Sequence, residues 1–170
     1  MAEVPSLFQA RKEKPSEEAR LYLGMTVESQ SYALAVESVR EILKIPRIYA
    51  LPKVPAFLKG VIDLRGAILP VVDLRERLGY GPVDPRKGRV VVAVIGNTPV
   101  GFLVDAVVEV FSAPSGELKP PPPMIRQQDL RFIEAMVRQE ERLYLILHLP
   151  VLFSPEEVDS LERRTWSKDA

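Results

Sequence analysis

The side chains that could act as catalysts or metal ligands are few in this sequence and stand far apart. His148 is the only histidine, within the apolar run 143–149, and the chain has no cysteine. Without a second histidine or a thiol, neither a Cys–His nucleophile pair nor a histidine cluster for zinc can form. We interpret His148 as a packed or surface side chain of a strand, rather than as a catalytic group or a ligand.

The carboxylates also lack the clustering that a metal site needs. Asp63, Asp73 and Asp105 are spread out and flanked by apolar residues, unlike the acids of a calcium-binding loop. We interpret each of them as a turn residue or a strand end. No glycine-rich loop is followed by the Lys-Ser/Thr pair that cradles a phosphate. We therefore expect no catalytic residue, no metal and no cofactor, and we do not expect an enzyme.

The stretch GVIDLRGAILPVVDLRERLG, residues 60–79, could instead display a surface for binding another protein. If residues 60–65 form a strand, Ile62 and Leu64 share the face that is buried. Asp63 and Arg65 then share the opposite face, which is free to be displayed.

Two residues after this strand make the stretch unusual. Gly66 permits a backbone geometry that other residues resist. Pro70 lies within an apolar run and cannot donate to a neighbouring strand, so it implies an edge strand or a bulge. An edge with an arginine held beside it is suited to docking. A barrel corner with a solvated arginine fits the same residues, and both interpretations stay open on physical grounds.

Short apolar runs that are rich in valine, and broken by turn residues, predict an all-β fold with little helix. About ten strands are expected, at residues 21–27, 32–36, 39–43, 60–65, 67–73, 89–95, 100–104, 107–111, 132–138 and 142–149. Loops or turns are expected at residues 28–31, 79–88, 96–99 and 139–141. One helical turn is expected at residues 74–78, stopped by Gly79. Many short strands favour barrels or sandwiches, and no crossover helices exist for a parallel sheet.

Three parts are expected along the chain: a charged flexible tail at 1–19, an ordered domain at 20–153, and a helix and tail at 154–170. Ser154 would be the N-cap of that last helix, with Pro155 at its first position. Residues 112–123 are expected to be a linker, whose four prolines, Pro120–Pro123, would form extended polyproline II.

Composition predicts the setting of the protein. Lys plus Arg and Asp plus Glu each number 23 in 170 residues, so the net charge is zero and binding to nucleic acid is not expected. No apolar run resembles a signal peptide or a transmembrane helix. We expect a cytoplasmic protein that does not insert into membranes.

The motif as a whole resembles the CheW family of chemotaxis coupling proteins. The similarity is carried by three segments, VxEI beginning at Val39, PAFxKGVIDLRG beginning at Pro55 and LPVVDLR beginning at Leu69. The segment VGFLVDAVVEV, which ends at Val110, is in the style of the same family. The resemblance covers about residues 21–153, almost the whole expected domain.

The resemblance implies two small five-stranded SH3-like barrels that share one core. It implies a non-enzymatic adaptor that couples the regulatory domain of a CheA-type histidine kinase to the cytoplasmic tip of a chemoreceptor. Carried onto matching positions, the partner-binding residues are Val39, Glu41, Gly60, Asp63, Arg65, Gly66 and Val110. Glu41 and Arg65 would be able to pair, whereas Ile62, Leu64, Ile68 and Val72 would belong to the core.

One position departs from the family pattern. Asp63 stands where members often carry Asn, so that a negative charge lies beside Arg65 and could pair with it. Two other functions stay open from the sequence: a CheW-like adaptor in another motility or two-component pathway, and a barrel that binds a small ligand.

Overall fold

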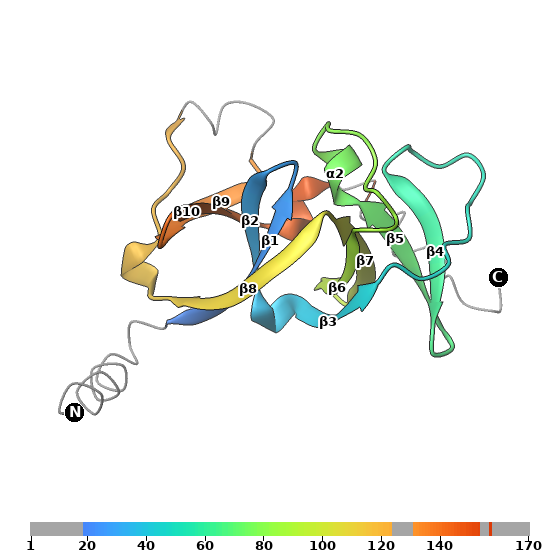
Figure 1. The fold of residues 1–170 in the computed structure, drawn as a ribbon, viewed down its shortest axis with the longest axis horizontal. Coiled ribbons are helices and arrows are strands. Elements are labelled where there is room, and N and C mark those ends of the chain that lie inside the picture. Colours follow the sequence, from blue (N-terminus) through green and yellow to red (C-terminus); the bar gives the residue numbers. More distant parts are fainter. Residues whose placement is uncertain (1–18, 124–130, 154–156, 158–170) are drawn as a thin grey trace.

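The computed structural model describes residues 19–123, 131–153 and 157, and shows two β-barrels side by side (Figure 1). The predicted tail at 1–19 and the predicted helix at 154–170 lie almost entirely outside the described residues. Ten strands in two five-stranded sheets confirm the all-β prediction. Within the described residues, no helix is long and apolar enough to cross a membrane.

The first barrel, here called the terminal barrel, is built from the two ends of the domain. Its sheet has the strand order β8-β1-β2-β10-β9. These strands are β1 (Arg20–Val27), β2 (Gln30–Ala35), β8 (Ala106–Ala113), β9 (Ile133–Gln139) and β10 (Arg142–Leu147). The short 3₁₀ turns η2 (Val36–Ser38), η3 (Ser115–Glu117) and η4 (Leu149–Leu152) follow β2, β8 and β10.

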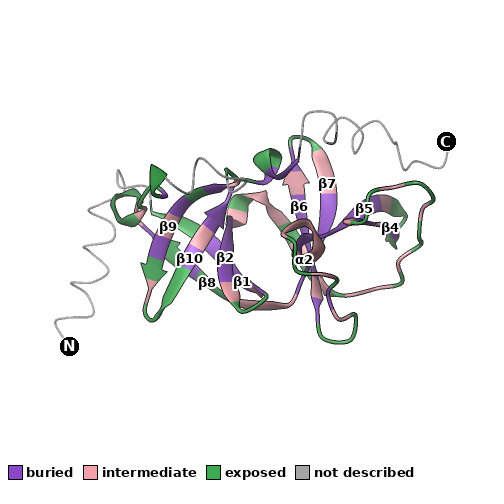
Figure 2. Cartoon of the chain, turned by 90° about the horizontal axis from the view of Figure 1, so that it is seen from above, coloured by how far each residue is buried: buried purple, intermediate pink, exposed green. Residues whose placement is uncertain are grey.

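The second barrel, here called the central barrel, is continuous in sequence and inserted between β2 and β8. Its sheet has the strand order β3-β6-β7-β5-β4. These strands are β3 (Val39–Lys44), β4 (Leu58–Leu64), β5 (Ala67–Asp73), β6 (Arg89–Ile95) and β7 (Thr98–Val104). One helical turn, α2 (Leu74–Arg77), follows β5 directly and lies between the barrels in both views (Figures 1 and 2).

The two barrels are closed in the same way. Each sheet contains one parallel pair, β2 with β10 and β5 with β7, among otherwise antiparallel neighbours. Each is closed by a single bridge between its two edges, Lys119 with Met136 and Tyr49 with Val61. Both bridges have two backbone hydrogen bonds, of 2.7 and 2.8 Å in the first and 2.8 and 2.9 Å in the second. The same barrel therefore occurs twice, with the strands in a permuted chain order.

Apolar side chains form one core that both barrels share and a separate interior in each. The shared core takes Leu23 and Met25 from β1 and Phe102 from β7. Residues adjacent in the sequence can face different cores: Leu23 faces the shared core, whereas Tyr22 faces the interior of the terminal barrel. Strands buried on both faces have continuous apolar runs, which explains the weak alternation in the sequence. Figure 2 shows the buried residues along the strands and the exposed ones mainly in the connections.

Two predicted features are tighter in the structure. The first hairpin turns over two residues, Glu28 and Ser29, with φ of 52° and 65°, and not over the four residues 28–31. The linker expected at 112–123 is wrong over residues 112–119, because β8 continues to Ala113 and Lys119 bridges to β9. Pairing across the barrel orders this segment, and single-sequence turn signals do not report such long-range pairing.

The prediction of an edge strand at Pro70 is wrong, whereas a bulge does occur next to it, in the partner strand β4 between Leu58 and Gly60. β5 lies between β4 and β7. Val61, opposite Pro70 in β4, directs its N–H and C=O to Tyr49, so the Val61–Pro70 pair makes no hydrogen bonds of its own. Pairing with β7 begins only at Val71. The nitrogen of Pro70 thus lies beyond the end of that ladder, and no hydrogen bond is lost.

Candidate protein-docking surface

The hairpin between β4 and β5 turns over only two residues, Arg65 and Gly66. Both have a left-handed backbone, with φ of 53° and 91°. Two such residues in succession form the tight turn that matches the twist of a hairpin, and Asn, Asp or Gly is preferred at its first position. Arginine there costs roughly 1 kcal/mol in backbone strain. Glu28, Lys53 and Glu140 have the same left-handed backbone, so the strain by itself does not distinguish Arg65.

The carboxylate of Asp63 supports this turn rather than pairing with Arg65. Its Oδ1 accepts a hydrogen bond of 2.9 Å from the backbone N–H of Gly66. An aspartate that bonds to a nearby backbone N–H is a common turn device. Asp63 is exposed and belongs to the tip of the hairpin. It does not form the charge pair with Arg65 that the sequence suggested.

Arg65 pairs instead with Glu41 of β3. The Nη2 of Arg65 donates to the Oε2 of Glu41, and the bond raises the pKa of the guanidinium above its ordinary value. The side chain of Arg65 is 70% exposed, and that of Glu41 is 29% exposed. An exposed pair adds little stability, so its main effect is to hold the arginine in one direction. We call Glu41, Asp63, Arg65 and Gly66 the Arg65 edge.

Gly60 lies near the start of β4, away from Arg65, and has a structural reason for being glycine. It is buried with φ of 143°, and a Cβ there would stand 2.0 Å from the carbonyl oxygen of Tyr49. Because Tyr49 forms the bridge that closes the central barrel, Gly60 is required for closure. The structure thus places Gly60 behind the surface and not on it.

The two valines predicted to bind partners lie apart from the Arg65 edge. Val39 is half-buried at the start of β3, where it packs against the shared core. Val110 is 57% exposed, on β8 of the terminal barrel, opposite Leu23 of β1. The predicted site is therefore divided, with Val110 on one barrel and the other residues on the other.

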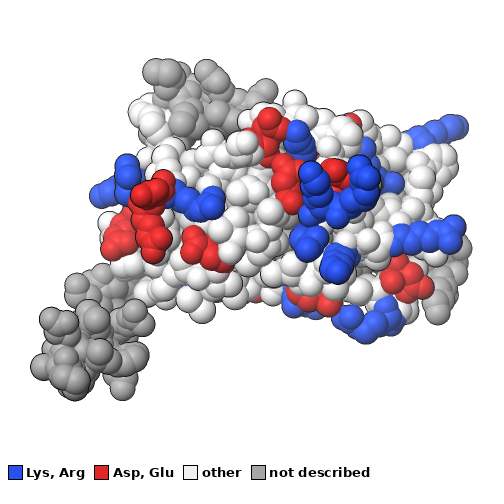
Figure 3. Space-filling view, in the orientation of Figure 1, with Lys and Arg blue, Asp and Glu red and all other residues white. Residues whose placement is uncertain are grey.

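The outer side of β3 is a part of the surface that the sequence interpretation missed. Ile42 is 42% exposed between the exposed side chains of Arg40 and Lys44. Lys44 stands opposite Arg89 in β6, and like charges directly opposite each other in a ladder are destabilising. Figure 3 shows most of the basic side chains over the central barrel. The alternation Arg-x-Ile-x-Lys in the sequence could have revealed this face.

Asp73, Asp105 and His148 occupy structural positions. Asp73 caps α2, Asp105 lies at the crossing from β7 to β8, and His148 Nδ1 lies 3.0 Å from Glu134 Oε1 on the surface. Among residues 19–123, 131–153 and 157, no group of three or more His, Asp or Glu side chains could hold a metal ion.

Comparison with known proteins gives consistent matches along the chain. The family model described as CheW-like domain matches residues 21–157. The chain is 33% identical to the probable chemotaxis protein CheW of Rhizobium etli, over 83% of this chain and 92% of that protein. It is 30% identical to the chemotaxis protein CheW of Bacillus subtilis, over 79% of this chain and 86% of that protein.

A solved structure resembles the fold as well. The scaffolding protein TtCheW from Thermoanaerobacter tengcongensis superposes with a TM-score of 0.74 and 30% identity. The match covers 80% of this chain and 93% of that chain.

Proposed function

The chain belongs to the CheW-like domain family, and from this membership we propose that it is a scaffold of chemotaxis signalling that joins a kinase to receptors. The kinase partner is of the CheA type and is bound through its regulatory domain. The receptor partner is bound at its cytoplasmic tip, which places the protein in the cytoplasm. The chain itself carries out no catalysis in this role.

One observation in the structure carries the assignment of the surface: Arg65 is exposed in a strained backbone and is held by Glu41. An oriented guanidinium presents its donors in a fixed fork, which suits carboxylates and carbonyl groups of a partner. The exposed Arg40 and Lys44 of β3 add positive charge to the same barrel, which favours acidic partners because complementary charge speeds and directs association. Val110 extends the proposed surface to the terminal barrel.

Binding titrations with a CheA-type regulatory domain and with a receptor tip fragment test this proposal. We expect dissociation constants on the order of micromolar for the unmodified chain, as in transient modular contacts. Arg65→Ala should weaken at least one of the two by about tenfold or more. Arg86→Ala is the matched control, because the side chain of Arg86 is 89% exposed on a loop of the same barrel. Full binding of both partners by Arg65→Ala would remove the Arg65 edge from the site.

A further inference from the structure

The helical turn α2 carries two arginines, and each reaches across to the terminal barrel. Arg75 and Arg77 are two positions apart on this single turn, so they leave it in different directions. Both are largely covered, with side chains 22% and 30% exposed. Neither is used by the Arg65 edge.

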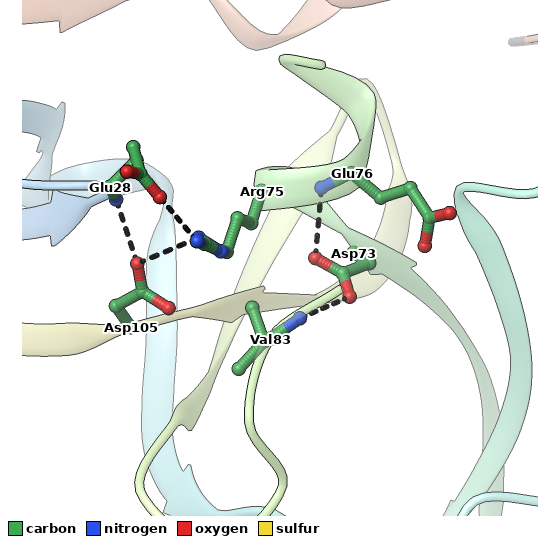
Figure 4. A network of polar contacts seen from close by, with 6 residues as sticks. All are labelled: Glu28, Asp73, Arg75, Glu76, Val83 and Asp105. Carbon is green, nitrogen blue, oxygen red and sulfur yellow. Dashed lines mark hydrogen bonds and ion pairs between the residues drawn. The ribbon is translucent and has the colours of Figure 1, made fainter. Parts of the chain in front are cut away.

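Arg75 contacts two carboxylates that adjoin strands of the terminal barrel, one directly after β1 and one directly before β8 (Figure 4). Its Nη2 donates to Glu28 Oε1 in the turn between β1 and β2. Its Nη1 is buried and lies 3.7 Å from Asp105 Oδ2, a contact that is electrostatic and not a hydrogen bond. Asp105 Oδ2 also accepts a 2.7 Å bond from the backbone N–H of Glu28. The three residues form a closed set at the crossing between the barrels.

The base of this set is anchored in the central barrel (Figure 4). Asp73 is 1% exposed, and its two oxygens accept from the N–H of Glu76 at 3.1 Å and of Val83 at 2.9 Å. Glu76 in turn pairs with Lys59 of β4. Because α2 is held at its cap and at its side, Arg75 projects from a fixed point.

Arg77 makes a second contact of a different kind. Its Nε donates to the carbonyl of Leu152 at 2.9 Å, in the segment that follows β10. Its guanidinium lies over the ring of Phe57 at 4.9 Å and over that of Phe153 at 5.6 Å. It also lies 3.3 Å from Glu157. Arg77 thus ties the end of the terminal barrel to the central one.

We propose that Arg75 and Arg77 are positioning residues that set the orientation of the terminal barrel relative to the central barrel, and thereby the docking surface that spans both. The shared core packs the two barrels closely together, and the two arginine forks add contacts of fixed angle between the same two barrels. This inference rests on the proposed function only where it concerns partners. A partner that touches both Arg65 and Val110 depends on the two arginines, and a partner confined to one barrel does not.

Distance measurements between spin labels test the orientation directly. The chain has no cysteine, so Arg138→Cys on β9 and Asn97→Cys in the turn after β6, both exposed, give two unique labels. The parent chain should give one narrow distance distribution. Arg75→Met and Arg77→Met should each broaden or shift it, and the double variant more so. Arg86→Met, which removes an equal charge without an inter-barrel contact, should leave it unchanged.

Glu28→Gln is a milder variant that tests the same contact of Arg75 without unfolding the protein. Glu28→Gln removes the charged partner of Arg75 but keeps the backbone N–H that donates to Asp105, so the hairpin should fold normally. It should broaden the distribution in the same sense as Arg75→Met, by a smaller amount. Identical distributions for the parent, Glu28→Gln and Arg75→Met would overturn the inference.

Binding separates this inference from the proposed function. A partner weakened by both Arg65→Ala and Val110→Asp counts as spanning both barrels, and Arg75→Met should weaken it about tenfold while sparing any other partner. Unchanged binding of the spanning partner alongside a changed distance distribution would refute the link to docking. If the parent chain binds neither partner, the proposed function fails, and the label distances still decide the role of the arginines.

Discussion

The terminal and central barrels share one arrangement of strands but are stabilised by different side chains. The terminal interior is built around stacked aromatic rings, Tyr22 on Phe111 at 5.6 Å and Phe111 on Tyr144 at 4.5 Å. The central interior contains no aromatic side chain among its described members and is filled by Val, Leu and Ile. The same closed sheet therefore tolerates two packing solutions, a few large rings or many small branched chains.

The hairpin tips differ in charge but agree in the left-handed backbone of their first residue. Arg65 and Gly66 turn β4 into β5, and Glu140 and Glu141 turn β9 into β10 at the corresponding place. Arg65 and Glu140 both have a left-handed backbone, with φ of 53° and 58°. Only the basic tip has an ion pair to its own barrel edge among the described residues. The proposed docking surface therefore uses the tip that has this ion pair.

The largest expected difference concerns the interiors. Phe111→Ala should lower the free energy of unfolding by about 3–5 kcal/mol, because it removes the middle ring of the terminal stack and leaves a cavity. Val90→Ala in the central interior should cost only about 2 kcal/mol, as one of many small contributors. Urea unfolding of both variants measures the two losses in the free energy of unfolding. Equal losses would contradict the expected difference between the two interiors.

Closure of the central barrel provides the next test. Gly60→Ala should cost about 3 kcal/mol, because the new methyl group would collide with the carbonyl of Tyr49 in a left-handed backbone. Gly116→Ala in η3 is the control, since nothing lies within 4 Å of its added Cβ. Thermal unfolding compares them. A Gly60→Ala chain as stable as the control would mean that the Tyr49 bridge is dispensable.

Titration should also separate the barrels, because the described carboxylates with shifted pKa values, Asp73 and Asp84, both belong to the central one. Burial raises the pKa of Asp73, and the backbone N–H of Arg86 lowers that of Asp84. A raised pKa means stability that is present at low pH and is lost as pH rises through the folded pKa. A lowered pKa gives stability that is lost as pH falls through the folded pKa.

Urea unfolding of Asp73→Asn and Asp84→Asn from pH 3 to 7 checks these signs. The advantage of the parent over Asp73→Asn should grow as pH falls, and its advantage over Asp84→Asn should shrink. The shifted groups of the terminal barrel are tyrosines, with burial raising the pKa of Tyr32 and Tyr144 to about 12. They stay neutral across this range. If the stability advantage of the parent over both variants changed in the same direction with pH, the opposite pKa shifts of Asp73 and Asp84 would be contradicted.

The smallest effect on stability is expected at the two hairpin tips, Arg65 and Glu140, where the effect on partner binding should differ most clearly. Arg65→Asn and Glu140→Asn should each raise the free energy of unfolding by about 0.5–1 kcal/mol, because asparagine accepts the left-handed backbone more readily. Only Arg65→Asn should weaken partner binding. Stability by urea unfolding and affinity by titration, measured on the same samples, separate strain from function. Weakened binding by Glu140→Asn would place function at both tips.

Local sequence signals predicted the strands and turns well, because these elements depend mainly on residues that are neighbours in the sequence. Valine-rich runs and turn residues predicted the strands, and Gly79 predicted the end of the helical turn. The division of ten strands into two barrels rested on the resemblance to a family. It depends on pairs such as Tyr22 with Phe111, which are far apart in the chain and leave no local pattern.

The candidate site was predicted in part for the same reason. The pairing of Glu41 with Arg65 was anticipated, whereas Asp63 was expected beside Arg65 and instead bonds to Gly66 three residues on. A short side chain takes the nearest backbone donor first. The reach of Arg75 and Arg77 was missed, because nothing near them in the sequence indicates which distant carboxylate or carbonyl they contact.

The insertion of the central barrel between β2 and β8 has a consequence for synthesis of the protein. All five strands of the central barrel leave the ribosome before β8, so that barrel can close while the chain is still growing. The hairpin of β1 and β2 emerges earliest, yet its outer neighbours β8 and β10 are made last. Closing that long loop costs entropy, which the finished central barrel reduces by holding the ends of the loop together. The first residues of the domain to be translated thus belong to the barrel that is completed last.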